Sequence, residues 1–393
     1  MDLGLKSFLL MKNVYYNYNI LYIRIALDYI TLNLSNEKKR CIIVIFSLNN
    51  KKIKFIATCT ILAIMLSACS KKVAEPVEPI SNTQFLMGTV CTIKIYDKSS
   101  TKVLDKGFKR ISEIENTMSI SKDQSEVIDI NNAAGEKPIK ISDGTMKVLK
   151  EGLRFAALTN GKMDITVGPL VKLWGIGTDK ARLPSKEEIL QKKALIGYKN
   201  LILDEKNKTA FLKNKGMVID LGAIAKGYTA DEVKEVLKEN GVEHAIINLG
   251  GNVFAMGKNV NDSPWKIGIQ DPFTQRGDII GMIEVEDKSI VTSGIYERYF
   301  EKDGKKYHHI LSTTTGYPCD NSIAGVSIVS VKSIDGDALS TSVFSLGLED
   351  GMKFINNMPG AEGIFITKDK QVYITPGLKG NFKITNTEFT LKN

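Results

Sequence analysis

A short apolar run near residue 60 divides this chain into a leader and a body. Residues 51–70 read KKIKFIATCTILAIMLSACS, in which lysines precede the apolar stretch Phe55–Leu66 and small residues follow it. A basic start, a short apolar stretch and small residues are typical of a secretory signal. About twelve apolar residues are too few to span a bilayer as a stable helix. The fold therefore has to be built from the residues that come after this run.

The end of the run carries a lipid-attachment pattern. Leu66–Cys69 reads LSAC and resembles the bacterial lipobox, in which the cysteine is acylated and becomes the first mature residue. The resemblance implies a signal peptide at 51–68, lipidation of Cys69, and a polar, proline-containing tether over 69–82. It places the body on the extracytoplasmic face of the cell membrane. An uncleaved signal or an ordinary membrane anchor is the alternative.

Residues 1–50 fit this arrangement poorly, because a signal peptide should begin near the start of the chain. They form an anomalous extension with two interpretations, an upstream segment from a misassigned start codon or a real extra segment. The first is favoured, although no methionine lies between Met11 and Met65, so a non-standard start near Leu48 would be needed.

The charge of the chain gives no support for nucleic-acid binding. The net charge is +9, but residues 1–68 contain nine basic and three acidic residues and so account for six of those charges. The body is close to neutral and lacks the excess of Lys and Arg that phosphate backbones require. Of the five cysteines, only Cys91 and Cys319 lie in the body, which is neither a disulfide framework nor a metal-binding spacing.

The body, residues 83–393, mixes strand and helix patterns without a βαβ repeat, which predicts the α+β class. The spacing of apolar residues predicts helices at 104–118, 143–159, 183–195, 230–239, 338–347 and 348–356. Alternation and short apolar runs predict strands at 84–96, 246–249, 265–270, 279–285, 323–331, 371–374 and 382–385. The first of these strands is entered from a turn at Gly88, and Asp143 is expected to cap the second helix.

Two segments have the composition of a phosphate and metal site. Residues 218–228 read VIDLGAIAKGY, so Asp220 and small residues end a strand before a helix, and Lys226 offers a point charge for a phosphate oxygen. The Walker spacing is absent, and a tight turn with a surface lysine is the plain alternative. Asp337 and Thr341 stand four residues apart, on one face of the first turn of a helix that begins near Asp337. A carboxylate and a hydroxyl there suit Mg²⁺, whereas simple helix capping is the alternative.

Two further segments contain rare aromatic residues. Residues 162–175 read KMDITVGPLVKLWG, and Trp174 is interpreted as a core residue in an irregular loop. His308 and His309 precede the sequence ILSTTTGYP. On a strand the two histidines face opposite ways, so at most one of them enters a given site. A zinc site is not expected, because no HExxH or CxxC motif accompanies them.

Taken together and in order, these segments resemble the ApbE family, the FAD:protein FMN transferases. The resemblance covers about 85–374 and rests on Met87-Gly88-Thr89, 163–170 (MDITVGPL), 220–228 (DLGAIAKGY), 248–252 (NLGGN), 265–272 (WKIGIQDP), 292–294 (TSG), 309–311 (HIL), Thr315-Gly316 and 337–341 (DALST). One departure is that Ser312-Thr313 stand where the family usually has Asp-Pro, and another is Lys162, where an apolar residue is usual.

The resemblance implies a T-fold-like, two-lobed single body with an FAD cleft between the lobes. It implies Mg²⁺ held by the backbone carbonyl of Ala223 and the side chains of Asp337 and Thr341. The FAD contacts that it implies are Met87, Lys162, Met163, Asp164, Asp220, Lys226, His309 and Ile310.

The implied activity is transfer of FMN from FAD to a Thr or Ser hydroxyl of an acceptor protein, with release of AMP. His309 is the candidate general base, and Asp220 is its rival. The acceptor implied by the family is a subunit of a membrane redox complex. An FAD pyrophosphatase that makes FMN and AMP is one alternative, and a non-enzymatic FAD-binding lipoprotein is another.

Overall fold

A large antiparallel sheet forms the centre of the structure. The computed structural model describes residues 78–392, which belong to one unit, Pro76–Asn393. The strand order of the sheet is β1-β2-β6-β7-β10-β13-β14-β15-β17, and only the β15–β17 pair is parallel. The strands are β1 (Ile80–Leu86), β2 (Thr89–Ile95), β6 (Ala245–Leu249), β7 (Asn252–Met256), β10 (Lys288–Gly294), β13 (Ile323–Ser330), β14 (Ala361–Thr367), β15 (Gln371–Ile374) and β17 (Thr390–Leu391).

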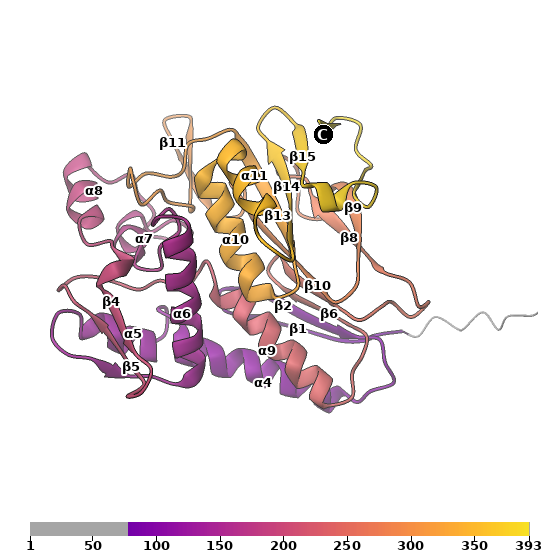
Figure 1. The fold of residues 1–393 in the computed structure, drawn as a ribbon, viewed down its shortest axis with the longest axis horizontal. Helices are drawn as coiled ribbons and strands as arrows, with labels where there is room; N and C mark the ends of the chain where they lie inside the picture. The colour runs from indigo at the N-terminus through magenta and orange to yellow at the C-terminus, as the bar shows by residue number, and fades with distance from the viewer. Residues whose placement is uncertain (1–77, 393) are drawn as a thin grey trace, which may run out of the picture. The chain divides into compact units, whose positions relative to one another are not determined.

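Helices and smaller sheets surround this sheet (Figure 1). The helices are α4 (Thr101–Met118), α5 (Glu126–Asn132), α6 (Asp143–Leu158), α7 (Gly168–Trp174), α8 (Lys186–Lys193), α9 (Ala225–Glu239), α10 (Ser333–Leu346) and α11 (Leu348–Asn356). The remaining strands are β3 (Ile139–Lys140), β4 (Leu201–Asp204), β5 (Thr209–Leu212), β8 (Trp265–Gln270), β9 (Ile279–Val285), β11 (Tyr299–Lys302), β12 (Lys305–His308) and β16 (Lys383–Ile384). They pair as β3-β5-β4, β16-β9-β8 and β11-β12.

The central sheet is covered on both faces. Strand β13 is buried at every position, and its alternate residues serve two different clusters. Val326 and Ile328 pack into the cluster that contains Leu339 and Val343 of α10, whereas Val329 packs with Ile283 of β9. Because strand side chains alternate between faces, one face meets the helices and the other meets the β16-β9-β8 sheet. Figure 1 shows α9 and α10 side by side against the central strands.

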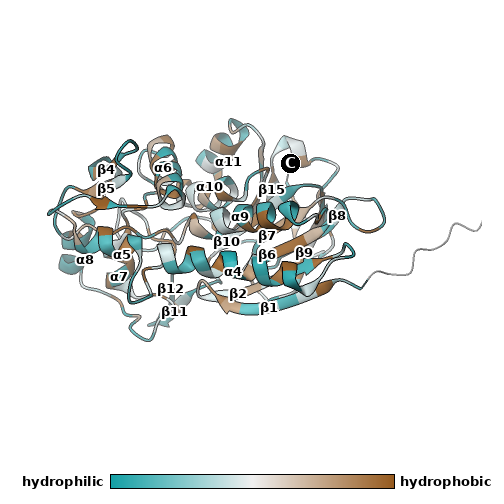
Figure 2. Cartoon of the chain, turned by 90° about the horizontal axis from the view of Figure 1, so that it is seen from below, coloured by the Kyte–Doolittle hydropathy of each residue, from teal (hydrophilic) through white to brown (hydrophobic). Residues whose placement is uncertain are grey.

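Helices α4 and α9 complete the helical layer. The buried face of α4 includes Leu104, Phe108 and Ile111, which lie in one cluster with Val233 and Leu237 of α9 and with strands β2, β6 and β7. Figure 2 shows these helices over the strands, with hydrophilic residues on the outer side of α4. This arrangement orients α9 along the sheet and holds its first turn beside α10.

The second lobe contains α5, α6, the β3-β5-β4 sheet and α7 with α8. Its core residues, for example Phe155, Met163 and Leu212, belong to the same hydrophobic cluster as Phe344 of α10 and Val326 of β13. The two lobes therefore form a single α+β body, as the sequence predicts. The FAD cleft between the lobes stays a prediction.

Most element predictions are confirmed, but several boundaries were wrong. The predicted tether 69–82 ends too late, because β1 begins at Ile80 and pairs with β2. Within 84–96, the strand predicted after the turn at Gly88 is confirmed as β2, and the residues before the turn belong to β1, which pairs with it. Helix α9 begins at Ala225, not Ala230, and residues 168–174 form α7 rather than a loop. Ser142, not Asp143, caps α6, through a hydrogen bond from Thr145 N–H to Ser142 Oγ (3.3 Å).

Helix α10 begins at Ser333, four residues before the predicted start near Asp337. Its first N–H groups donate to Asp231 of α9, Ser333 N to Oδ1 (2.8 Å) and Ile334 N to Oδ2 (2.9 Å). A cap supplied by another helix leaves no signal in the local sequence, so Asp337 falls in the second turn instead of the first.

The predictions for residues 1–50, the signal peptide 51–68 and Cys69 lie outside the described residues. Within residues 78–392, no helix is both long and apolar enough to cross a membrane.

Candidate active site

The elbow at Asp220, the turn that precedes α9, is held in place by the segment that contains Met163 and Asp164. The strand predicted before Asp220 was wrong, because Val218 forms only an isolated bridge with Val167. Asp220 N donates to Ile165 O (2.8 Å), and Gly168 N donates to Val218 O (3.2 Å). Gly222 N then donates to Asp220 Oδ1 (2.8 Å), which closes a tight turn before α9. Burial raises the pKa of Asp220, and this rise is opposed by the Gly222 hydrogen bond and by nearby positive charges.

Helices α9 and α10 meet closely at Gly227. A Cβ built on Gly227 would lie 2.3 Å from Ser333 O and 2.7 Å from Asp337 Cβ, so only glycine allows this approach. Gly227 N donates to Asp337 Oδ2 (2.9 Å), and the Asp337 side chain is buried. The structure thus brings together the two segments that the sequence singled out for a phosphate and metal site.

The side-chain ammonium group of Lys226 lies at this junction. Lys226 Nζ is 3.4 Å from Asp337 Oδ1 and donates to Gly222 O at 3.1 Å. A carboxylate oxygen and a backbone carbonyl oxygen therefore converge on one positive charge beside Ala223. Thr341 lies one turn beyond Asp337 on the same helix.

The donors at this junction fit a hard divalent cation. In residues 78–392 no three His, Cys, Asp or Glu side chains are grouped as a metal site, so a metal here would depend on carbonyl and hydroxyl ligands as well as Asp337. Carbonyl, hydroxyl and carboxylate oxygens are the ligands that Mg²⁺ prefers. The metal assignment of Ala223, Asp337 and Thr341 stays a prediction.

The Thr-Ser-Gly segment of β10, residues 292–294, contacts α10. Ser293 and Ser340 share a hydrogen bond between their hydroxyls (2.8 Å), and Ser340 Oγ donates to Asp337 O (2.8 Å). These two hydrogen bonds fix the backbone of α10 at Asp337. The Thr-Ser-Gly segment therefore has a structural role, and this role requires no contact with substrate.

Met87 lies in the β1–β2 turn in a left-handed conformation, with φ of 53°. Such a φ is uncommon for a residue other than glycine. Its N–H donates to Glu115 Oε1 of α4 (2.7 Å), which holds the turn in this conformation. The Met87 side chain is partly buried and packs against two of the core clusters.

Lys162, Met163 and Asp164 have different surroundings. Lys162 is exposed and donates to Thr314 Oγ1 (3.3 Å), whereas Met163 is buried. The Asp164 carboxylate is buried and accepts hydrogen bonds from Thr166 N, Thr166 Oγ1 and Tyr198 N, each 2.8 Å. Burial raises the Asp164 pKa and these bonds oppose the rise. Its side chain is thus committed to the local backbone, and its contact with FAD stays a prediction.

The two histidines have different surroundings, but strand alternation does not explain this, because β12 ends at His308 and His309 lies outside it. His308 is buried on β12, where Nδ1 accepts from Ile310 N (3.3 Å), so Nε2 carries the proton and donates to Cys319 O (3.0 Å). His309 Nδ1 lies 3.3 Å from Arg298 O, an acceptor, so Nδ1 carries the proton and the Nε2 lone pair is free to act as a base. Burial lowers the pKa of His309 to about 4, and the charges of Arg298 and Lys226 act in the same direction.

The segment after His309 keeps a closed loop despite its departure from the family pattern. Ser312 Oγ accepts from Thr315 N (3.1 Å), and Thr313 Oγ1 donates to Gly161 O (2.7 Å), which ties the loop to the residue before Lys162. Ile310 is buried in the core. Trp174 is fully buried and its Nε1 donates to Gly316 O (2.9 Å), which confirms that it is a core residue.

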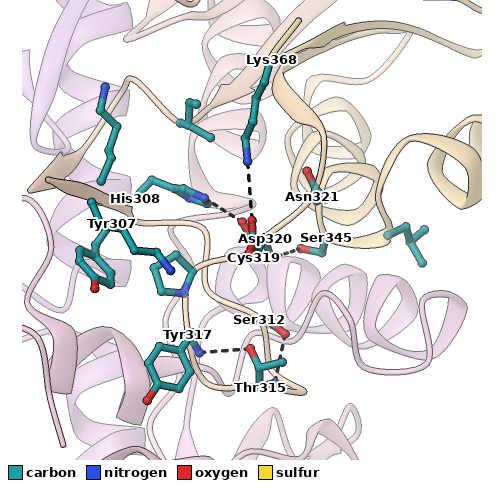
Figure 3. A pocket seen from close by; sticks show the side chains of 15 residues that line it. Tyr307, His308, Ser312, Thr315, Tyr317, Cys319, Asp320, Asn321, Ser345 and Lys368 are labelled. Atoms are coloured by element: carbon teal, nitrogen blue, oxygen red, sulfur yellow. Dashed lines mark hydrogen bonds and ion pairs between the residues drawn. The ribbon is translucent and has the colours of Figure 1, made fainter. Parts of the chain in front are cut away.

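A pocket of about 660 Å³ lies next to this loop (Figure 3). Its lining includes His308, Asp320, Ser345 and Lys368, and Ser345 follows Thr341 by one turn of α10. Lys368 pairs with Asp320 across it at 3.7 Å. None of the residues predicted to bind FAD or metal lines this pocket, so the sequence motifs did not indicate it.

Sequence reasoning also missed Arg298, in the turn between β10 and β11. Its NH2 donates to Gly88 O (3.3 Å), and its backbone carbonyl accepts from His309 N (3.1 Å). The contact with Gly88 has no sequence signal, because the two residues are 210 apart along the chain, whereas the contact with His309 adjoins the β11–β12 hairpin.

Comparisons with known proteins show the family of this chain. The model of the ApbE family matches residues 87–365. The FAD:protein FMN transferase of Klebsiella pneumoniae (strain 342) is 37% identical over 295 residues, which are 75% of this chain and 91% of that protein. That of Treponema pallidum (strain Nichols) is 32% identical over 333 residues, 80% of this chain and 92% of that protein. The solved structure of the flavin transferase ApbE from Vibrio cholerae superposes with a TM-score of 0.70 and 30% identity, over 78% of this chain and all of that one.

The α+β body and its similarity to these proteins define an enzyme of the transferase class. The family match covers both lobes and every residue predicted to bind FAD or metal. The chain belongs to the ApbE family.

Proposed function

We propose that this chain transfers FMN from FAD to a threonine or serine hydroxyl of an acceptor protein in a magnesium-dependent reaction that releases AMP. The curated relatives are named FAD:protein FMN transferase, and the chain covers most of their length. The observation that carries the proposal is the convergence of Asp337 Oδ1 and Gly222 O on the Lys226 ammonium, at 3.4 Å and 3.1 Å. The Lys226 ammonium lies next to the Asp337 carboxylate. A positive charge and a carboxylate side by side suit the pyrophosphate of a dinucleotide together with a divalent cation.

In the proposed step, the acceptor hydroxyl oxygen attacks the phosphorus on the FMN side of the pyrophosphate. The bond between this phosphorus and the bridging oxygen breaks, AMP leaves with that oxygen, and FMN stays attached through a phosphodiester. Such a transfer needs positioning and charge neutralisation more than covalent help from the protein. Bound Mg²⁺, with Asp337, Thr341 and the Ala223 carbonyl as ligands, would neutralise charge on the phosphates.

The hydroxyl proton goes to a general base, for which His309 is the candidate. Its Nε2 has no hydrogen-bond partner among residues 78–392, and its pKa of about 4 keeps it neutral at pH 7. Asp220 is the rival, although its Oδ1 already accepts from Gly222 N (2.8 Å). Lys226 adds positive charge at the pyrophosphate. Met87, at the tip of the β1–β2 turn, is proposed to contact the flavin.

We further propose that the enzyme is anchored through a lipid on Cys69 at the extracytoplasmic face of the cell membrane. Its acceptor would then be an exposed segment of a membrane redox-complex subunit, because the tether limits the enzyme to partners at the same surface. Both points rest on the sequence pattern at 51–82 and on the family resemblance.

The test uses the full-length protein in detergent with FAD, Mg²⁺ and a candidate redox-complex subunit. Flavin fluorescence in a denaturing gel measures covalent transfer, and chromatography measures AMP and free FMN. The matched control is the same subunit with its Thr or Ser acceptor replaced by alanine. We expect a fluorescent acceptor and one AMP per flavin transferred, with neither product after chelation of Mg²⁺.

Other outcomes identify the alternatives. Free FMN and AMP in equal amounts, with or without acceptor, would identify an FAD pyrophosphatase. Tight FAD binding in Mg²⁺ without any cleavage would identify a flavin-binding lipoprotein.

A further inference from the structure

Arg298 is a charged residue without a partner of opposite charge. Residues 78–392 contain five arginines, and three of them form ion pairs with carboxylates, namely Arg110, Arg154 and Arg182. Within the same range Arg298 forms no ion pair, and its side chain is exposed. An arginine that is held by the fold but has no carboxylate partner is available to an anionic ligand.

The position of Arg298 is defined by three segments of the candidate active site. Its guanidinium donates to Gly88 O (3.3 Å), in the turn that contains Met87. Its carbonyl accepts from the backbone of His309 and lies 3.3 Å from His309 Nδ1. Burial raises the pKa of Asp220, and the positive charge of Arg298 opposes this rise. The guanidinium is therefore close enough to act on the Asp220 carboxylate.

A glycine makes room for the arginine side chain. Gly177 has φ of +87°, and a Cβ built on it would lie 2.9 Å from Arg298 Cδ and 3.5 Å from Cγ. The stem of Arg298 therefore packs directly on the backbone at Gly177. Because the stem packs on Gly177 and the guanidinium is bonded to Gly88 O, the charge is held beside the β1–β2 turn although the side chain is exposed.

We propose that the Arg298 guanidinium binds the pyrophosphate of the dinucleotide, opposite Lys226. This role rests on the flavin transfer proposed above. A guanidinium presents a planar fork that matches two phosphate oxygens, whereas Lys226 supplies a single ammonium. Arg298 would also couple substrate binding to the base, because its own carbonyl orients the His309 ring.

The test compares a ligand that has the pyrophosphate with one that lacks it. FAD and riboflavin binding are measured by equilibrium dialysis with the full-length protein in Mg²⁺ without acceptor, and chromatography verifies that FAD stays intact. The variant is Arg298→Gln, and Arg298→Lys keeps the charge but removes the fork. Arg154→Gln is the matched control, because it removes the same charge from α6. Thermal unfolding verifies that each variant is folded.

We expect Arg298→Gln to weaken FAD binding by on the order of 10- to 100-fold and to leave riboflavin binding unchanged, as a charge-assisted contact with phosphate requires. Arg298→Lys should give an intermediate loss, and Arg154→Gln none. A second variant, Gly177→Ala, should displace the arginine without changing its charge and weaken FAD selectively as well.

An equal loss of FAD and riboflavin binding in Arg298→Gln, or no loss of either, would overturn the assignment of Arg298 while leaving the flavin transferase intact. Absence of FAD binding by the unmodified protein would overturn both proposals. Selective loss of FAD binding supports the arginine site whichever acceptor the enzyme uses.

Discussion

Replacing Gly227 by alanine should disturb both stability and catalysis, because it crowds the contact between α9 and α10. The new Cβ would lie 2.3 Å from Ser333 O and 2.7 Å from Asp337 Cβ. Ordinary contacts between such atoms begin near 3.4 Å, so the two helices have to move apart by about 1 Å. The crowded atom is a backbone carbonyl oxygen, which no side-chain rotation can relieve.

The expected cost follows from two opposing effects. Overpacking costs about 1–3 kcal/mol, and a backbone clash belongs at the upper end of that range. Alanine gains about 1 kcal/mol over glycine inside a helix. The net loss in the free energy of unfolding is therefore about 2 kcal/mol, or a fall of roughly 4 °C in Tm for a body of this size. Because a displacement of about 1 Å at a positioned group costs up to about 100-fold in rate, flavin transfer should fall by a comparable factor.

The assay is thermal unfolding monitored by circular dichroism, with flavin transfer measured on the same preparation. Gly241→Ala, just after the same helix, is the control: it has φ of +77° and nothing within 4 Å of the built Cβ. That variant should lose only the cost of the left-handed backbone, about 1–2 kcal/mol, and keep full activity. A Gly227→Ala protein that melts at or above the temperature of the unmodified one, with normal rates, would refute the close contact at Gly227.

Three further predictions concern the buried polar groups. Asp337→Asn keeps the shape of the side chain and should leave Tm within a few degrees, yet lower the rate by at least about 100-fold and abolish its dependence on Mg²⁺; an unchanged Mg²⁺ titration would contradict the metal assignment. His309→Ala should lower the transfer rate by about 100- to 10,000-fold between pH 6 and 8, because the base is neutral throughout that range; labelling that is unchanged across pH would exclude His309 as the base. Burial lowers the pKa of His308 from 6.5 to about 4, so in this interval the unfolded chain binds a proton at this residue while the folded one does not. The contribution of His308 to stability therefore falls as the pH is lowered from 6.5 to 4, by about 1.4 kcal/mol per pH unit at most, and His309, whose pKa is also about 4, contributes in the same direction. In urea unfolding, His308→Asn should reduce the slope of the pH profile by the share of His308, and an unaltered slope would contradict the assignment.

Short sequence motifs predicted the chemistry of the site better than they predicted the helices and caps that position its residues. The elbow at Asp220 and the pair Asp337 and Thr341 stand out in the sequence, because their residue types and spacing suit phosphate and Mg²⁺. The start of α10 could not be predicted, because its cap is Asp231 of another helix. Helix α7 was overlooked because Gly168 and Pro169 suggest a turn, although proline is well tolerated in the first turn of a helix.

The sequence by itself determined the α+β class, the order of the main elements and the family resemblance, since these depend on periodicity and on motifs a few residues long. Only the tertiary structure decided which groups meet. Lys226 and Asp337 are 111 residues apart in the chain, and Arg298 and Gly88 are 210 apart. Such contacts are set by how closely two helices pack and by the order of strands in a sheet, and neither is encoded in the spacing of neighbouring residues.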